Sequence, residues 1–114
     1  MHEFSICRSI LRQVTLAAEQ QGNGRVRVIR LRLGPLAAVS ATELERAMPL
    51  VSQGSIADGA AIVTELVPLR VACEVCGAES TADPARLACG ACGNHKVRPL
   101  NGDELLLVGI ELVQ

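Results

Sequence analysis

Two pairs of cysteines in the second half of the chain constrain its fold more than any other feature. Cys73 and Cys76 form one C-x2-C motif, Cys89 and Cys92 form another, and twelve residues separate the pairs. Two residues between cysteines allow one tight turn to direct both thiolates at a single ion, and the glycine after each pair suits the positive φ of such a turn. Four thiolates at about 2.3 Å complete a tetrahedral zinc shell without room for water, so the spacing predicts a structural zinc site and not a hydrolytic one.

The segment that carries these cysteines has too few large apolar side chains to fold by itself. Between Cys73 and Cys92 only Val75 and Leu87 are large and apolar. Binding of a structural zinc ion contributes roughly 10–16 kcal/mol and is expected to supply the missing stability. Two disulfides would need an oxidising compartment, and an iron–sulfur cluster uses the same ligands, although paired knuckles are more usual for zinc. The remaining cysteine, Cys7, is expected to be a small core residue.

The first half of the chain predicts two helices. Apolar residues at helical spacing indicate a helix over roughly 5–21, which Ser5 can cap and a glycine-rich run ends. A second helix begins at a capping box formed by Ser40 and Glu43. Pro49 lies inside its apolar stripe and removes a backbone donor, so this helix should kink or stop at about the preceding residue.

Three segments predict strands, at 25–33, 60–69 and 104–112. The first alternates apolar and basic residues, and its alternation changes parity at Val28 and Ile29, which indicates a bulge. With 114 residues the chain has the size of one domain.

We therefore expect an α+β fold in which two helices pack on a three-stranded mixed sheet and a four-cysteine zinc ribbon is inserted as a separate lobe. The expected α/β domain comprises 1–69 and is completed by 102–114 as its last strand. The zinc lobe comprises 70–101, and His95 is expected to be a loop histidine within it.

Composition argues against several classes of function. The chain has 11 Lys+Arg against 12 Asp+Glu, one Phe and neither Tyr nor Trp, so there is no overall attraction to nucleic acid and no aromatic platform for bases. It has no apolar run of about 20 residues and no signal peptide, which predicts a cytoplasmic protein without membrane association. A row of arginines on the first strand leaves a nucleic-acid-binding zinc ribbon as an alternative: Arg25, Arg27, Arg30 and Arg32. The solvated face and edge of a strand is the favoured interpretation, because the arginines straddle the parity change and no aromatic residues lie between them.

An enzymatic function is not indicated. The chain contains neither a phosphate-binding GxxxxGK[ST] motif nor a Gly-x-Ser-x-Gly motif, and the predicted zinc site has no open position. We therefore expect a protein that is not an enzyme.

The chain starts with Met1, His2 and Glu3. A terminal amine, the amide nitrogen of His2 and its imidazole Nδ1 can form fused chelate rings around one ion, to which Glu3 adds a further ligand. This planar, nitrogen-rich set suits nickel(II) or copper(II), and not zinc, which prefers a tetrahedron. The alternative interpretation is a solvated chain end without a function.

The order of these features resembles the HypA/HybF family of hydrogenase nickel-incorporation proteins. The resemblance lies in the start MHEFSICRSI, a first strand followed by GPL, a second helix, two C-x2-C knuckles and a closing GDELLLVGIEL, and it covers essentially the whole chain. Two stretches depart from the family pattern: the second helix contains Pro49 and lacks phenylalanines, and the segment GNHKVRPLNG is less typical.

The resemblance implies a nickel metallochaperone that delivers Ni(II) during maturation of [NiFe]-hydrogenase, and in some organisms also of urease. Nickel would be bound by Met1, His2 and Glu3, with His2 as the essential side chain. Structural zinc would be bound by the four paired cysteines: Cys73, Cys76, Cys89 and Cys92. The implied partners are a HypB-type GTPase and the hydrogenase large-subunit precursor, with urease accessory proteins in some organisms.

Overall fold

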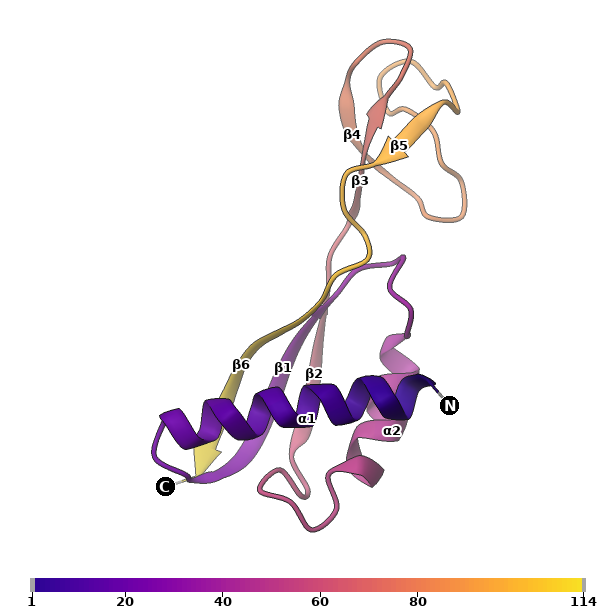
Figure 1. Cartoon of the computed structure of the whole chain (residues 1–114). Coiled ribbons are helices and arrows are strands. Elements are labelled where there is room, and N and C mark those ends of the chain that lie inside the picture. Colours follow the sequence, from indigo (N-terminus) through magenta and orange to yellow (C-terminus); the bar gives the residue numbers. More distant parts are fainter. Residues whose placement is uncertain (1, 114) are drawn as a thin grey trace. The chain divides into compact units, whose positions relative to one another are not determined.

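The computed structural model describes residues 2–113 (Figure 1). Its elements follow one another as α1 (His2–Gln20), β1 (Arg25–Leu33), α2 (Ala41–Val51), β2 (Ala61–Leu66), β3 (Leu69–Cys73), β4 (Glu79–Ala82), β5 (Val97–Pro99) and β6 (Leu105–Val113). They form two compact units. The first comprises 1–32, 39–65 and 106–114, and the second comprises 33–38 and 66–105.

The first unit contains a three-stranded sheet with the strand order β2-β1-β6. Figure 1 shows β1 and β2 running in the same direction and β6 running in the opposite direction, so the sheet is mixed. The connection from β1 to β2 passes through α2, as expected for neighbouring parallel strands. Both helices pack against each other and cover the sheet. The predicted fold of two helices on a three-stranded mixed sheet is confirmed.

The core of this unit consists of aliphatic side chains from α1, β1 and α2. The buried residues of α1 recur at helical spacing and include Cys7, which confirms its expected place in the core. On β1 the burial alternates, but its parity changes between Val26 and Ile29, which agrees with the altered pattern in the sequence. Leu44 and Met48 of α2 are fully buried.

The start of α2 follows the predicted capping box. The Glu43 amide donates to Ser40 Oγ at 3.1 Å, and the Ser40 amide donates to Glu43 Oε1 at 3.0 Å. The helix does not stop before Pro49 but continues to Val51. Pro49 lies in the last turn, so its missing donor costs only one bond near the end of the helix, where the chain is about to leave the helical path in any case.

The second unit contains a small antiparallel sheet with the strand order β4-β3-β5. Leu69 and Val71 of β3 are buried together with Ala82 of β4, and Val97 of β5 packs against them. The cysteines at 73, 76, 89 and 92 belong to this unit, which therefore confirms the expected four-cysteine lobe.

Two element boundaries differ from the sequence prediction. The first helix begins at His2 and not near Ser5, because an acidic residue, Glu3, suits the positive end of the helix dipole in the first turn. The strand expected at 60–69 is divided: β2 ends at Leu66, and only Leu69 of the expected range belongs to β3. Pro68 lies at the division, and since proline has no backbone N–H it interrupts the ladder there.

The unit boundaries fall at 32/33, 38/39, 65/66 and 105/106, whereas the sequence predicted domain boundaries at 69/70 and 101/102. Whether the units fold as separate domains stays a prediction. Neither helix in the described part of the chain combines the length and the apolar character that a membrane span requires.

Glycine is required where the turn after β1 approaches the segment before β6. A Cβ on Gly34 would lie 2.1 Å from the Gly102 carbonyl oxygen, and Gly102 itself has a φ of 124°. The two segments are joined by hydrogen bonds from the Gly34 amide to Glu104 O at 2.9 Å and from the Leu36 amide to Gly102 O at 2.7 Å. A side chain at Gly34 would therefore displace backbone that is already hydrogen-bonded.

Candidate metal centres

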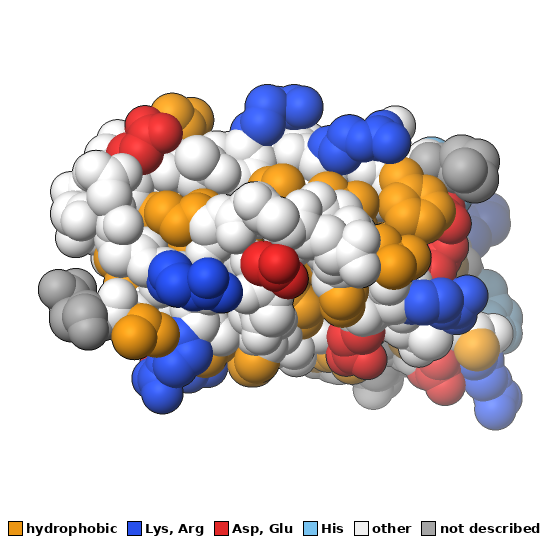
Figure 2. Space-filling model, turned by 90° about the horizontal axis from the view of Figure 1, so that it is seen from below, with side chains coloured by type: hydrophobic (Ala, Val, Ile, Leu, Met, Phe, Trp, Pro, Cys, Tyr) orange, Lys and Arg blue, Asp and Glu red, His pale blue; other side chains and the backbone are white. Residues whose placement is uncertain are grey.

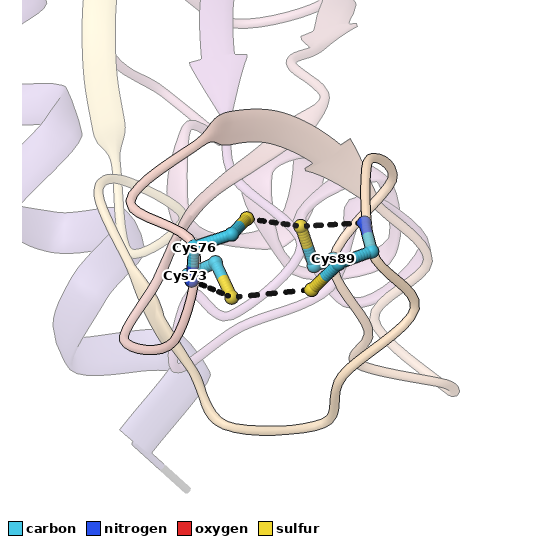
Figure 3. Close-up of side chains that lie close together, drawn as sticks. Cys73, Cys76 and Cys89 are labelled. Atoms are coloured by element: carbon cyan, nitrogen blue, oxygen red, sulfur yellow. Dashed lines mark hydrogen bonds between the residues drawn. The ribbon is translucent and has the colours of Figure 1, made fainter.

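The four paired cysteines come together around a common centre. Their sulfur atoms all lie within 4.8 Å of one another, and all four thiols are free. Figure 3 shows Cys73, Cys76 and Cys89 directed toward this centre. Cys73 Sγ lies 3.7 Å from Cys92 Sγ, and Cys76 Sγ lies 3.6 Å from Cys89 Sγ.

These distances fit thiolates around one ion. Sulfur ligands at about 2.3 Å from a tetrahedral zinc ion lie about 3.8 Å apart, whereas the sulfurs of a disulfide are separated by about 2.05 Å. The observed separations of 3.6 and 3.7 Å match the edge of the tetrahedron. The residues present therefore fit a four-coordinate metal with a closed thiolate shell.

Backbone amides hold the first sulfur of each pair in the same way. Cys73 Sγ accepts from the amides two and three residues later, those of Val75 and Cys76, both at 3.4 Å. Cys89 Sγ accepts from the equivalent amides of its own turn at 3.3 and 3.4 Å. The glycines that close the two turns have φ values of 79° and 77°, as the sequence predicted for these positions.

The same amides favour ionised thiolates. Hydrogen bonds from the Cys92 and Ala91 amides lower the pKa of Cys89 to about 6, and the corresponding amides lower the pKa of Cys73. At Cys76 the Ala78 amide acts in the same direction, but the neighbouring Cys89 thiol and desolvation outweigh it and raise the pKa to about 11. Four adjacent thiols cannot all ionise without a cation, so a divalent ion would supply the charge that the site lacks.

His95 does not belong to the cysteine cluster. Its Nδ1 lies 2.9 Å from the Leu87 carbonyl oxygen, and the side chain is exposed. This placement agrees with the expected loop histidine.

A second cluster lies at the start of α1. His2 and Glu3 stand in the first turn of this helix, with His2 Nδ1 3.9 Å from Glu3 Oε2. The His2 side chain is 59% exposed and the Glu3 side chain 25% exposed, so both lie at the surface. A hydrogen bond from its own backbone amide lowers the pKa of Glu3, which favours the carboxylate that a cation would bind. The predicted ligand Met1 lies outside the described residues.

Glu43 joins this cluster from α2. The ligand atoms of His2, Glu3 and Glu43 all lie within 4.8 Å of one another. From the sequence, Glu43 is recognisable only as a capping residue, because nothing in the linear pattern indicates that the starts of the two helices meet. The one sequence pattern that points to Glu43 is the capping box, which places its carboxylate at the start of α2.

The arginine row of β1 is largely paired with acidic side chains. Glu111 accepts from Arg27 and Arg30, both at 2.5 Å, and Glu65 accepts from Arg32 at 3.1 Å. The hydrogen bond from Arg30, followed by that from Arg27, lowers the pKa of Glu111. On the face seen in Figure 2, basic side chains are interspersed with acidic and apolar ones. Pairing of this kind favours a solvated strand face over a phosphate-binding row, and the expectation that the protein binds no nucleic acid stays a prediction.

Comparison with known proteins identifies the family. Residues 1–112 match the family model described as "Hydrogenase/urease nickel incorporation, metallochaperone, hypA". The chain belongs to the HypA family. It is 40% identical over 113 residues to "Hydrogenase maturation factor HypA" of Nitrosospira multiformis, which covers 99% of this chain and 98% of that protein. It is also 40% identical over 112 residues to the protein of the same name from Streptomyces avermitilis, which covers 96% of this chain and 86% of the relative.

Solved HypA structures share the fold. The solution structure of the Ni metallochaperone HypA from Helicobacter pylori matches with a TM-score of 0.67 and 16% identity over 97% of both chains. A second HypA solution structure matches with a TM-score of 0.70 and 17% identity over 99% of this chain and 97% of that chain. These relatives are named as maturation factors or as a metallochaperone, and not as catalysts.

Proposed function

We propose that this protein is a cytoplasmic nickel metallochaperone that binds Ni(II) at its N-terminus and delivers it during maturation of [NiFe]-hydrogenase. Met1 contributes its terminal amine, and His2 and Glu3 contribute the remaining ligands. Cys73, Cys76, Cys89 and Cys92 bind a structural zinc ion. The observation that carries this proposal is the match of residues 1–112 to the family model, because that range includes both the Met-His-Glu start and the four cysteines.

The chemistry of the two sites supports separate roles. A closed shell of four thiolates leaves no position from which an incoming ligand could take the metal, so the cysteine site suits a permanent ion. The site at the start of α1 is exposed and offers nitrogen and oxygen ligands, which suit nickel. An ion there can be approached by the ligands of another protein and so transferred.

The position of His2 and Glu3 in the first helical turn is compatible with ligation through their backbone nitrogens. The first four N–H groups of a helix have no acceptor in a preceding turn. A metal that replaces the proton on such a nitrogen therefore breaks no hydrogen bond of the helical ladder. The same position gives an unfavourable interaction of roughly 0.3–1 kcal/mol between the cation and the helix dipole, which Glu3 partly offsets and which favours release.

The partners that this function requires are a HypB-type GTPase and the hydrogenase large-subunit precursor. In organisms that contain urease, its accessory proteins are additional partners.

Maturation of hydrogenase in cells tests the proposal. A hydrogenase-producing bacterium that lacks its own HypA protein would receive the wild-type chain, the His2→Ala variant, or a His95→Ala control. We expect the wild type and the control to restore nickel in the hydrogenase large subunit and the His2→Ala variant to fail at low nickel supply. Equal restoration by His2→Ala, at equal protein abundance, would contradict the proposed delivery site.

A further inference from the structure

The cluster at the start of α1 contains a residue that the proposed nickel ligands do not include. Glu43 belongs to the first turn of α2, and its carboxylate lies within 4.8 Å of the nearest ligand atoms of both His2 and Glu3. Glu3 and Glu43 are half-buried, and they line one hollow of about 200 Å³ together with Phe4, Arg46, Ala47 and Leu50. The two carboxylates therefore face a common space beside the imidazole.

The capping box fixes the position of the Glu43 carboxylate. One oxygen, Oε1, accepts from the Ser40 amide at 3.0 Å, and the Ser40 hydroxyl in turn accepts from the Glu43 amide at 3.1 Å. A carboxylate has a second oxygen with its own lone pairs. Helix capping and metal ligation can thus be performed by the two oxygens of one side chain, and the first of them holds the second in place.

We infer that Glu43 is a further ligand of the nickel ion, so that bound cargo joins the start of α1 to the start of α2. This inference rests on the proposed function, since it concerns the same cargo. Metal–ligand bonds of about 2.1 Å allow two ligands of one ion to lie up to about 4.2 Å apart. The separations of up to 4.8 Å in this cluster exceed that limit by less than 1 Å.

The charge of the site explains why a second carboxylate is needed. Each helix N-terminus carries the equivalent of roughly +0.5 charge, and two such ends meet here. The negative charge of Glu3 alone would only balance the partial positive charges of these two helix ends. Arg46 adds a further positive charge to the wall of the same hollow. With Glu43 the site has a second negative charge, which favours retention of a divalent cation.

Nickel titration calorimetry on tag-free protein with an intact Met1 tests this role. The decisive variant is Glu43→Gln, because the glutamine carbonyl oxygen can still accept from the Ser40 amide while the charged ligand is lost. Glu45→Gln is the matched control: it removes the same charge two residues later on the same helix, outside the cluster. We expect Glu43→Gln to weaken nickel binding at least about tenfold, as for disruption of other metal sites, and Glu45→Gln to leave it within about twofold.

Two further measurements separate ligation from stability and from the proposed function itself. Nickel should slow amide hydrogen exchange over 41–44 in the wild type and not in Glu43→Gln, while the melting temperatures of the metal-free proteins stay alike. If Glu43→Gln binds nickel as tightly as the wild type while His2→Ala does not, the role of Glu43 is refuted and the N-terminal site stands. If the wild type shows no nickel site that depends on His2, both proposals are refuted.

Discussion

Removal of the metal from the four-cysteine unit should unfold that unit and leave the first unit folded. The perturbation is a zinc chelator applied to the purified protein. The reason lies in the small core cluster of the second unit, in which the large buried side chains are Leu69 and Val71. The first unit has a larger core, built from α1, β1 and α2.

The stabilisation of the second unit by its buried apolar side chains can be compared with its stabilisation by the metal. Full burial of a valine or leucine side chain stabilises the folded state by about 1.5–3 kcal/mol, so Leu69 and Val71 together contribute about 3–6 kcal/mol. The two large apolar residues between the cysteine pairs add little, since Val75 is 60% exposed and Leu87 is 36% exposed. A structural zinc ion contributes about 10–16 kcal/mol. Its loss is therefore larger than the contribution of these two side chains.

Amide hydrogen exchange followed by mass spectrometry provides the assay. Protection of the ladder between β3 and β4 should disappear when the metal is removed and return when zinc is added, while the amides of α1 and β1 stay protected. A Cys7→Ala variant serves as a control, because this cysteine is buried in the first unit and should not affect metal content. Unchanged protection of β3 after complete removal of the metal would refute the reasoning.

Three further predictions concern other parts of the molecule. Gly34→Ala should lower the free energy of unfolding by about 1–3 kcal/mol in chemical denaturation, because its Cβ would collide with the Gly102 carbonyl; an unchanged midpoint would contradict this. Arg27 and Arg30 lower the pKa of Glu111, so the ion pairs stabilise the fold above about pH 5 and are lost as the pH falls through the lower pKa of the folded state. The stability difference between wild type and Glu111→Gln should accordingly be constant near neutral pH and vanish in acid. Nickel affinity should fall steeply from pH 7 to pH 6, since the amine and imidazole must release protons to bind, and a flat profile would contradict the ligand set.

The metal-binding lobe was predictable from the sequence because its determinants are local. Two residues between cysteines and a following glycine define each turn without reference to the rest of the chain, and the structure places the four sulfurs around one centre. The capping box of α2 was predictable for the same reason, since Ser40 and Glu43 contact each other within one helical turn.

Features that depend on tertiary contacts were not predictable in this way. The sequence predicts a helix start near Ser5, a residue that can cap a helix, although the helix begins at His2. It predicts one strand over 60–69, although β2 ends at Leu66 and a separate strand, β3, begins at Leu69 and pairs with β4 and β5. The proximity of Glu43 to His2 depends on how the two helices pack, which linear spacing does not encode.

A calorimetric nickel titration tests the central claim most directly. It compares tag-free protein with an intact Met1, the His2→Ala variant, and a version with one extra residue before Met1, with zinc content measured in each. The account predicts one nickel site in the wild type, its loss in both variants, and unchanged zinc in all three. Equal nickel binding by all three proteins would show that the Met-His-Glu start is not the cargo site and would contradict the account.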